Sequence, residues 1–124
     1  MALVPTPNDA SPMDRFDWER LIRRVRFGPK RHSYRVVALT LATYADADGS
    51  RVFPGVDRLA MATEMSERTV KRALAWLREF EFIVKTKQGN RHARHADEYQ
   101  LTMPSWLSER ELLPPEEIGT RGIS

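Results

Sequence analysis

The stretch Val56-Asp-Arg-Leu-Ala-Met-Ala-Thr-Glu-Met-Ser-Glu-Arg-Thr-Val-Lys-Arg-Ala-Leu-Ala-Trp-Leu77 decides the fold. Its apolar residues recur at three- and four-residue steps on both sides of an interruption at Thr63-Glu-Met-Ser66, which indicates two consecutive amphipathic helices. Ser66 is a suitable N-cap for the second helix. We predict a first helix that begins near Gly55, a tight turn, and a second helix from Ser66 to about Phe80.

The second helix has two chemically different faces. Its apolar face consists of Val70, Ala73, Leu74, Leu77 and Phe80. Its opposite face carries charged side chains: Glu67, Arg68, Lys71, Arg72 and Arg78. A helix with a cationic outer face fits the major groove of duplex DNA, which is about 12 Å wide. The alternative is an ordinary solvated face, and Arg78, late in the helix, fits that alternative.

Two further helices and an extended piece precede this stretch. Apolar residues from Asp14 onward predict a first helix that ends at Gly28-Pro29. Ser33 is the expected N-cap of a second helix, which is apolar on nearly every side and therefore central to the core. Turn residues from Asp46 to Gly49 end that helix, and 51–54 is a short extended piece that Pro54 limits to an edge strand or the end of a strand.

The period of the apolar pattern changes to two after Phe80. Strands are expected at about 82–87 and 98–103, and the loop between them, 88–97, is rich in positive charge. Two strands around such a loop predict a β-hairpin. We divide the chain into a flexible lead (1–13), one domain (14–103) and a tail (104–124) with one short helix over 105–113.

This order of elements is that of a winged helix-turn-helix, an α+β fold that is mainly α. It has four core helices, a short strand and a C-terminal hairpin, the wing. The domain expected here would be held by one modest core, since 124 residues suit a single domain.

The stretch from Val56 to Leu77 resembles the helix-turn-helix domains of actinobacterial, plasmid and phage DNA-binding proteins. The resemblance extends through Ala42-Thr-Tyr-Ala-Asp-Ala-Asp-Gly49, Phe53-Pro54 and Ala96-Asp-Glu-Tyr-Gln-Leu-Thr102, and so covers roughly 18–102. In this family a run of the type Ser-Glu-Arg-Thr-Val-Lys-Arg opens the recognition helix. The resemblance therefore implies base or phosphate contacts by Ser66, Arg68, Thr69, Lys71 and Arg72. The family includes both replication initiators and transcriptional regulators. The resemblance therefore implies DNA binding but does not specify the biological role.

The chain departs from the family pattern at the turn. Glu64 stands where glycine is usual. If that residue requires a positive φ, a side chain there costs on the order of 1 kcal/mol. The contact residues would shift by one position if the turn were built differently.

The hairpin and the first loop supply further candidate contacts with DNA phosphates. In the wing these are Lys85, Lys87, Arg91, His92 and Arg94, and around the second helix they are Lys30, Arg31 and Ser33. For the wing the alternative is a basic loop without a fixed partner. For the second group the alternative is a solubilising face. His92, His95 and Asp97 are too few to predict a zinc site.

Charge and composition narrow the function classes. The segment from Arg20 to Gln100 carries 17 Lys or Arg and nine Asp or Glu, so its net charge of +8 exceeds the +3 of the whole chain. A basic body favours an anionic partner. The sequence has no cysteine, no apolar run of about 20 residues, no catalytic constellation and no phosphate-binding glycine loop. We therefore expect a soluble, cytoplasmic, nucleoid-associated protein that is not an enzyme and has no cofactor.

Two functions remain open at this stage. The first is a sequence-specific double-stranded DNA-binding protein, a transcriptional regulator or a replication or excision accessory factor, which as a homodimer would bind repeated half-sites. The second is a winged-helix module that docks another protein. That alternative depends on Trp76 and Trp106 being exposed and on the acidic tail, which contains Glu109, Glu111, Glu116 and Glu117.

Overall fold

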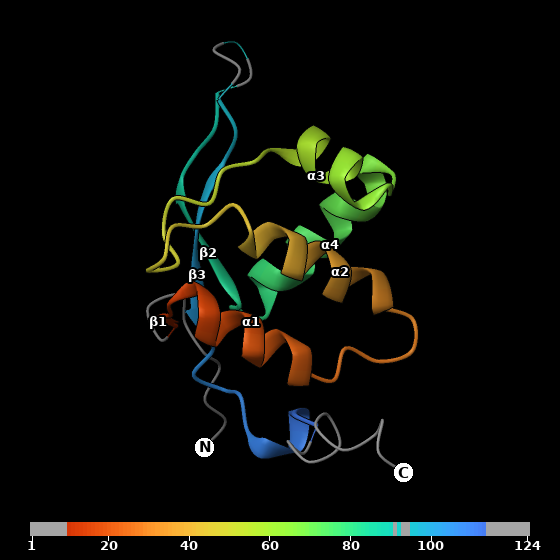
Figure 1. The fold of residues 1–124 in the computed structure, drawn as a ribbon, viewed down its shortest axis with the longest axis vertical. Coiled ribbons are helices and arrows are strands. Elements are labelled where there is room, and N and C mark those ends of the chain that lie inside the picture. Colours follow the sequence, from red (N-terminus) through yellow and green to blue (C-terminus); the bar gives the residue numbers. More distant parts are fainter. Residues whose placement is uncertain (1–9, 91, 93–94, 114–124) are drawn as a thin grey trace.

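The computed structural model describes residues 10–90, 92 and 95–113, which form four α-helices beside a three-stranded antiparallel sheet (Figure 1). The helices are α1 (Arg15–Arg24), α2 (His32–Ala42), α3 (Val56–Thr63) and α4 (Glu67–Glu79). The strands are β1 (Ser11–Pro12), β2 (Ile83–Lys87) and β3 (Glu98–Met103), in the order β1-β3-β2, and a 3-10 turn, η2, covers Glu109–Glu111. The predicted winged helix-turn-helix is confirmed.

Helix α2 lies at the centre of the core, as its apolar composition predicts. Val37, Ala38, Leu41 and Ala42 are fully buried, and α2 packs against each of the other three helices. The sheet joins this core through Trp18 of α1, which is fully buried and whose indole N–H donates to the Phe82 carbonyl at 2.9 Å.

Helix α1 ends four residues before the predicted stop at Gly28-Pro29. Asp14 caps its beginning by accepting a hydrogen bond from the Asp17 amide. At its end the backbone turns extended at Val25, which forms a β-bridge with Leu112. The helix stops there because a distant segment of chain competes for its backbone groups.

The same pairing changes the expected helix over 105–113. The structure contains only the 3-10 turn η2 in this part, followed by the bridge at Leu112. The Arg26 amide donates to the Glu111 carbonyl at 2.7 Å, and the Leu113 amide donates to the Arg24 carbonyl at 2.7 Å. Extended pairing with the exit of α1 therefore replaces the predicted helix.

The N-terminal boundary also differs from the prediction. Ser11 and Pro12, which we had placed in the flexible lead, form β1 and pair with Met103 and Thr102 of β3. Proline is acceptable there because β1 is an edge strand. The sheet therefore begins before residue 14, and residues 1–9 lie outside the part of the chain that is described.

The N-cap predicted at Ser33 is wrong. Helix α2 begins at His32, and its N-cap is Arg31, whose side chain makes no capping hydrogen bond. Ser33 is the second residue of the helix and is half-buried. The loop before α2 is fixed by other contacts, described below, so a capping serine is not required to start the helix.

The turn and the extended piece between α2 and α3 follow the prediction. The Gly49 amide donates to the Asp46 carbonyl at 2.8 Å, and Val52 forms a bridge with Tyr99 of β3. Gly49 has φ of +84° and lies so close to the N-terminal segment that a Cβ would stand 2.0 Å from the Met13 carbonyl oxygen. This position therefore requires glycine.

Candidate nucleic-acid interface

The turn between α3 and α4 holds α4 at a fixed angle on the core. Glu64 adopts φ of +58°, the left-handed conformation that a glycine would adopt more easily, so the expected strain is present. The Met65 amide closes the turn by donating to the Ala60 carbonyl at 3.1 Å. Ser66 caps α4, as predicted, by accepting a hydrogen bond from the Thr69 amide at 3.1 Å.

Helix α4 buries one face and exposes the other. Its apolar face is buried against the core: Val70, Ala73, Leu74 and Leu77. Its outer face is exposed and carries Glu67, Arg68, Lys71, Arg72 and Arg78. None of these five side chains forms an ion pair with another residue in the described part of the chain. The cations of α4 are therefore available to an external anion.

Ser66 and Thr69 differ from the other predicted contacts. Their hydroxyl groups lie 3.1 Å apart and hydrogen-bond to each other, while the Ser66 oxygen also accepts from the Thr69 amide. Thr69 is half-buried. These two residues hold the beginning of the helix, and the exposed charged side chains Glu67, Arg68, Lys71 and Arg72 are the freer candidates.

The wing is the hairpin of β2 and β3, which projects beyond the helices in Figure 1. Lys85 is half-buried and forms an ion pair with Asp97 at 3.0 Å, and its ammonium also donates to Gln88 at 3.3 Å. Lys87 is exposed and forms no ion pair with any residue that the structure describes. The two predicted lysine contacts thus have different surroundings.

The end of the wing is partly described. Asn90 and His95 exchange two backbone hydrogen bonds of 2.9 Å, and His92 is exposed. The predicted contacts Arg91 and Arg94 lie outside the described residues. Asp97 is tied to the hairpin through Gly89 and Lys85, and no group of three metal-ligating side chains occurs among the residues searched.

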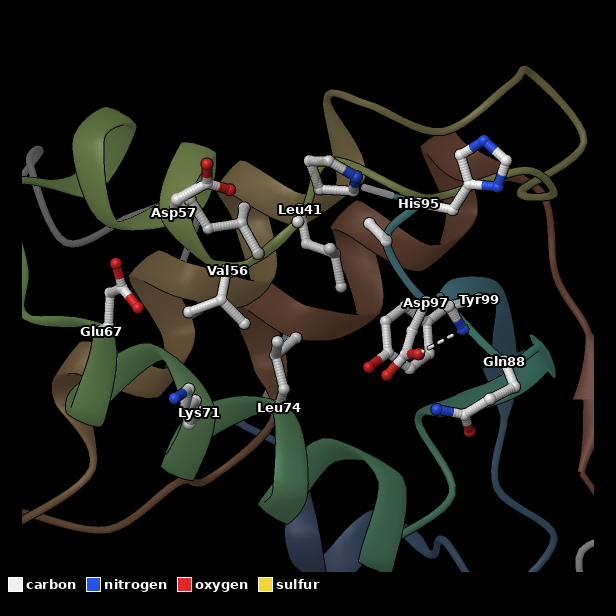
Figure 2. A pocket seen from close by; sticks show the side chains of 15 residues that line it. Leu41, Val56, Asp57, Glu67, Lys71, Leu74, Gln88, His95, Asp97 and Tyr99 are labelled. Carbon is white, nitrogen blue, oxygen red and sulfur yellow. Dashed lines mark hydrogen bonds between the residues drawn. The ribbon is translucent and has the colours of Figure 1, made fainter. Parts of the chain in front are cut away.

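A cleft of about 770 Å³ separates α4 from the wing. Figure 2 shows Glu67 and Lys71 of α4 on one side of it, and Asp97 and His95 of the wing on the other. Asp57, at the beginning of α3, also lines the cleft. The cleft therefore has both cationic and anionic groups on its walls.

The loop between α1 and α2 lies against the other side of α4. The Arg31 guanidinium stands over the Trp76 ring of α4 at 5.9 Å and donates to the Phe27 carbonyl at 3.3 Å. Arg35 donates to the carbonyls of Arg23 and Val25 at 2.6 and 2.8 Å. Partial burial lowers the pKa of Arg35, which acts as a structural clamp on this loop.

The predicted phosphate contacts of this region therefore differ in their accessibility to an external partner; they are Lys30, Arg31 and Ser33. Lys30 is exposed, Arg31 is exposed but partly engaged, and Ser33 is half-buried inside the helix. The clamp by Arg35 was not predicted, because nothing in the local sequence shows that its partners are carbonyl groups of the preceding helix exit.

The two tryptophans invoked for protein docking lie in an aromatic cluster. The Trp76 ring stacks on Phe82 at 5.8 Å and also contacts Phe27 and Phe80. Trp106 packs edge-on against Phe80 and Phe82, and its indole N–H donates to the Phe80 carbonyl at 2.8 Å. These rings connect α4, the sheet and the C-terminal segment, so the sequence support for a docking module is weakened.

Comparison with known proteins identifies the central part of this fold. Residues 31–83 match the family described as a helix-turn-helix domain, and they contain α2, α3, the turn and α4. No curated protein and no solved structure is similar enough to match the chain. The central part of the chain is therefore similar to a helix-turn-helix domain, and the structure shows a hairpin wing after it. None of the described helices has the length and apolar character to cross a membrane.

Proposed function

We propose that this protein binds duplex DNA in a sequence-specific manner, with α4 as the recognition helix. The observation that supports this most directly is the outer face of α4, where Arg68, Lys71 and Arg72 are exposed and unpaired among the described residues. The buried back of the helix holds these side chains in one direction. A helix presented in this way is the element that enters a major groove in helix-turn-helix proteins.

The side chains of α4 divide into two groups around the helix axis. Glu67 and Lys71 line the cleft next to buried Leu74, whereas Arg68 and Arg72 lie farther round the helix. Arginine recognises guanine through a bidentate pair of hydrogen bonds, and a carboxylate accepts from the amino group of cytosine. We assign base recognition to Arg68, Arg72 and Glu67.

Phosphate contacts complete the interface on both sides of the recognition helix. Lys87 and His92, with Arg91 and Arg94, would supply them from the wing, and Lys30 and Arg31 would supply them from the opposite side. Such contacts position a protein on the duplex but do not read its sequence. Because wing and helix would occupy adjacent grooves, one sugar-phosphate strand would run along the cleft between them.

The biological role follows the resemblance seen in the sequence. We propose a non-enzymatic transcriptional regulator, or a replication or excision accessory factor, of a bacterium, plasmid or phage, without a cofactor. It would act in the cytoplasm at the nucleoid. A homodimer on two half-sites would give it the length of operator that such proteins commonly need.

Selection of bound fragments from a random duplex library tests the proposal. We expect an enriched motif, and binding to that duplex should weaken steeply as salt increases, because cations on the protein displace condensed counterions. The spacing of any repeated motif would also report whether the protein binds as a dimer. A library that shows no enrichment, together with salt-independent retention, would reject DNA recognition by α4.

A further inference from the structure

Asp97 connects the two arms of the wing through both of its carboxylate oxygens. Oδ1 accepts a hydrogen bond from the Gly89 amide at 2.7 Å, and Oδ2 lies 3.0 Å from the Lys85 ammonium. Asp97 immediately precedes β3, whereas Lys85 and Gly89 belong to the opposite arm. One side chain thus joins three points of the hairpin.

This connection occurs where the backbone ladder is irregular. The regular pairing of Lys85 with Tyr99 is followed by a shift, after which Lys87 pairs with Glu98. The Asn90–His95 pair is the next backbone contact between the described parts of the two arms. The Asp97 carboxylate therefore joins the two arms in the stretch where backbone pairing between them is least regular.

The surroundings of Asp97 make the connection strong for a surface site. The side chains of Lys85 and Asp97 are only 21% and 31% exposed, which limits screening by solvent. The Gly89 amide, and next to it Lys85, hold the pKa of Asp97 below its ordinary value, and the positive charge of Arg78 on α4 acts in the same direction. The main partners of Asp97 therefore lie within its own hairpin, in Gly89 and Lys85.

Gly89 allows the two arms to come this close. A Cβ at this position would stand 2.5 Å from the His95 carbonyl oxygen and 2.7 Å from the Asp97 nitrogen. The hydrogen bond from its amide to Asp97 thus depends on a backbone approach that only glycine permits. The hydrogen bond between Gly89 and Asp97 is therefore part of the backbone conformation of the hairpin.

We propose that Asp97 is a positioning residue that fixes the direction of the wing relative to α4, with Lys85 as its internal counter-ion. This inference rests on the proposed function, since its consequence is a wing held ready for DNA. Lys85 then contributes to binding through Asp97, and the phosphate contacts of the wing fall to Lys87 and the cations near the tip. Asp97 lines the cleft on the side opposite Lys71 (Figure 2).

A substitution that removes the charge of Asp97 distinguishes positioning from simple electrostatics, because the two predict changes of DNA affinity in opposite directions. Asp97→Asn removes a negative charge beside the DNA, which by charge alone would strengthen binding. Loss of positioning would weaken it. Glu98→Gln is the matched control, because the adjacent Glu98 carboxylate forms no ion pair with any residue described in the structure.

The first measurement is fluorescence anisotropy of a labelled random-sequence duplex titrated with each variant at low salt. We expect Asp97→Asn to bind about threefold to tenfold more weakly than Glu98→Gln, and Asp97→Ala to bind more weakly still, because it also loses the bond to Gly89. Binding by Asp97→Asn that equals or exceeds that of Glu98→Gln overturns the inference.

The second measurement follows the wing without DNA. The sequence has no cysteine, so spin labels can be placed through His92→Cys on the wing and Ala62→Cys on α3. We expect Asp97→Asn to broaden or shift the distance distribution between the labels, while Glu98→Gln leaves it unchanged. An unchanged distribution in Asp97→Asn contradicts positioning, even for a protein that proves not to bind DNA. Failure of the parent to bind the duplex, with a shifted distribution in Asp97→Asn, would instead reject only the proposed function.

Discussion

The outer face of α4 and the wing both carry cations, but the cations differ in whether they are paired with an acidic side chain. On α4, Arg68, Lys71 and Arg72 have no ion pair in the described part of the structure, whereas Lys85 of the wing is neutralised by Asp97 at 3.0 Å. The rigidity of α4 comes from its buried apolar back, so its charges are not needed for its own structure. The wing has little core of its own and uses part of its charge to hold its shape. Equal charges at an interface therefore need not be equal contacts.

The largest effect should come from truncating a buried apolar residue of α4, because these residues hold the helix on the core. Leu77 is fully buried, and Leu77→Ala should lower the free energy of unfolding by about 2–5 kcal/mol through lost burial and a cavity. Urea denaturation measures this loss. Ala75→Gln, on the exposed face, is the control and should change stability by no more than about 0.5 kcal/mol. Similar losses in both variants would show that the two faces of α4 are not divided as described.

The next effect concerns an unpaired cation of α4. Arg68→Ala should weaken binding to the selected duplex by about 1–3 kcal/mol and relax base choice at one position. Anisotropy titrations of single-base variants of the duplex would measure both changes. The control is Arg20→Ala, since Arg20 lies on α1 and pairs with Asp17 at 3.6 Å. Unchanged binding by Arg68→Ala removes this residue from the contact map.

Substitutions of the two wing lysines, Lys85 and Lys87, should differ in how they change the salt dependence of DNA binding. Lys87→Ala should reduce the slope of log affinity against log salt by about 1, because it removes one phosphate contact. Lys85→Ala should weaken binding with a smaller change of slope, since its charge is already paired with Asp97. The slopes come from titrations at several salt concentrations. Equal losses of slope in the two variants would mean that Lys85 contacts phosphate directly.

A smaller effect tests the strain in the turn that presents α4. Glu64→Gly should raise the free energy of unfolding by about 0.5 kcal/mol, because glycine adopts its φ of +58° with less steric cost. Ala75→Gly, at an exposed position in the interior of α4, should lower it by about 1 kcal/mol. Thermal unfolding distinguishes these opposite signs. Destabilisation by Glu64→Gly would mean that the Glu64 side chain contributes more than its backbone costs.

The smallest effect is a dependence of stability on pH. The bond from Gly89 and the charge of Lys85 lower the pKa of Asp97 in the folded protein. Its stabilising contribution is therefore complete above the unfolded pKa of about 3.9 and is lost as the pH falls through the lower folded value. As the pH falls below about 4, the melting temperature of Asp97→Asn should consequently fall less steeply than that of the parent. Glu98→Gln should keep the parental slope, and identical slopes in all three proteins would argue against the Asp97 contacts.

Local patterns in the sequence predict the helix-turn-helix segment well. The cap at Ser66, the apolar stripe of α4 and the strained turn at Glu64 depend on neighbours only a few residues away. The hairpin is equally local, because its strands show a period of two on either side of a loop. For these elements the physical causes lie within the segment itself.

The remaining features depend on contacts between distant residues. The end of α1 is set by Leu112 and Leu113, and the first strand exists because β3 offers it an edge. The roles of Asp97 and Lys85 depend on hairpin register, which a shift after Lys85 makes difficult to read from the sequence. Trp76 could be placed on a helix from the sequence, but its aromatic neighbours come from three other parts of the chain.

The pairing between α1 and the C-terminal segment has a consequence for the order of folding. The Arg24 side chain and backbone form hydrogen bonds with Leu113 across 89 residues, so a growing polypeptide on the ribosome cannot make these bonds before Leu113 has been synthesised. The local pair α3–α4 can form earlier, because its contacts close short loops. During synthesis α4 would thus form before the exit of α1 reaches its final pairing.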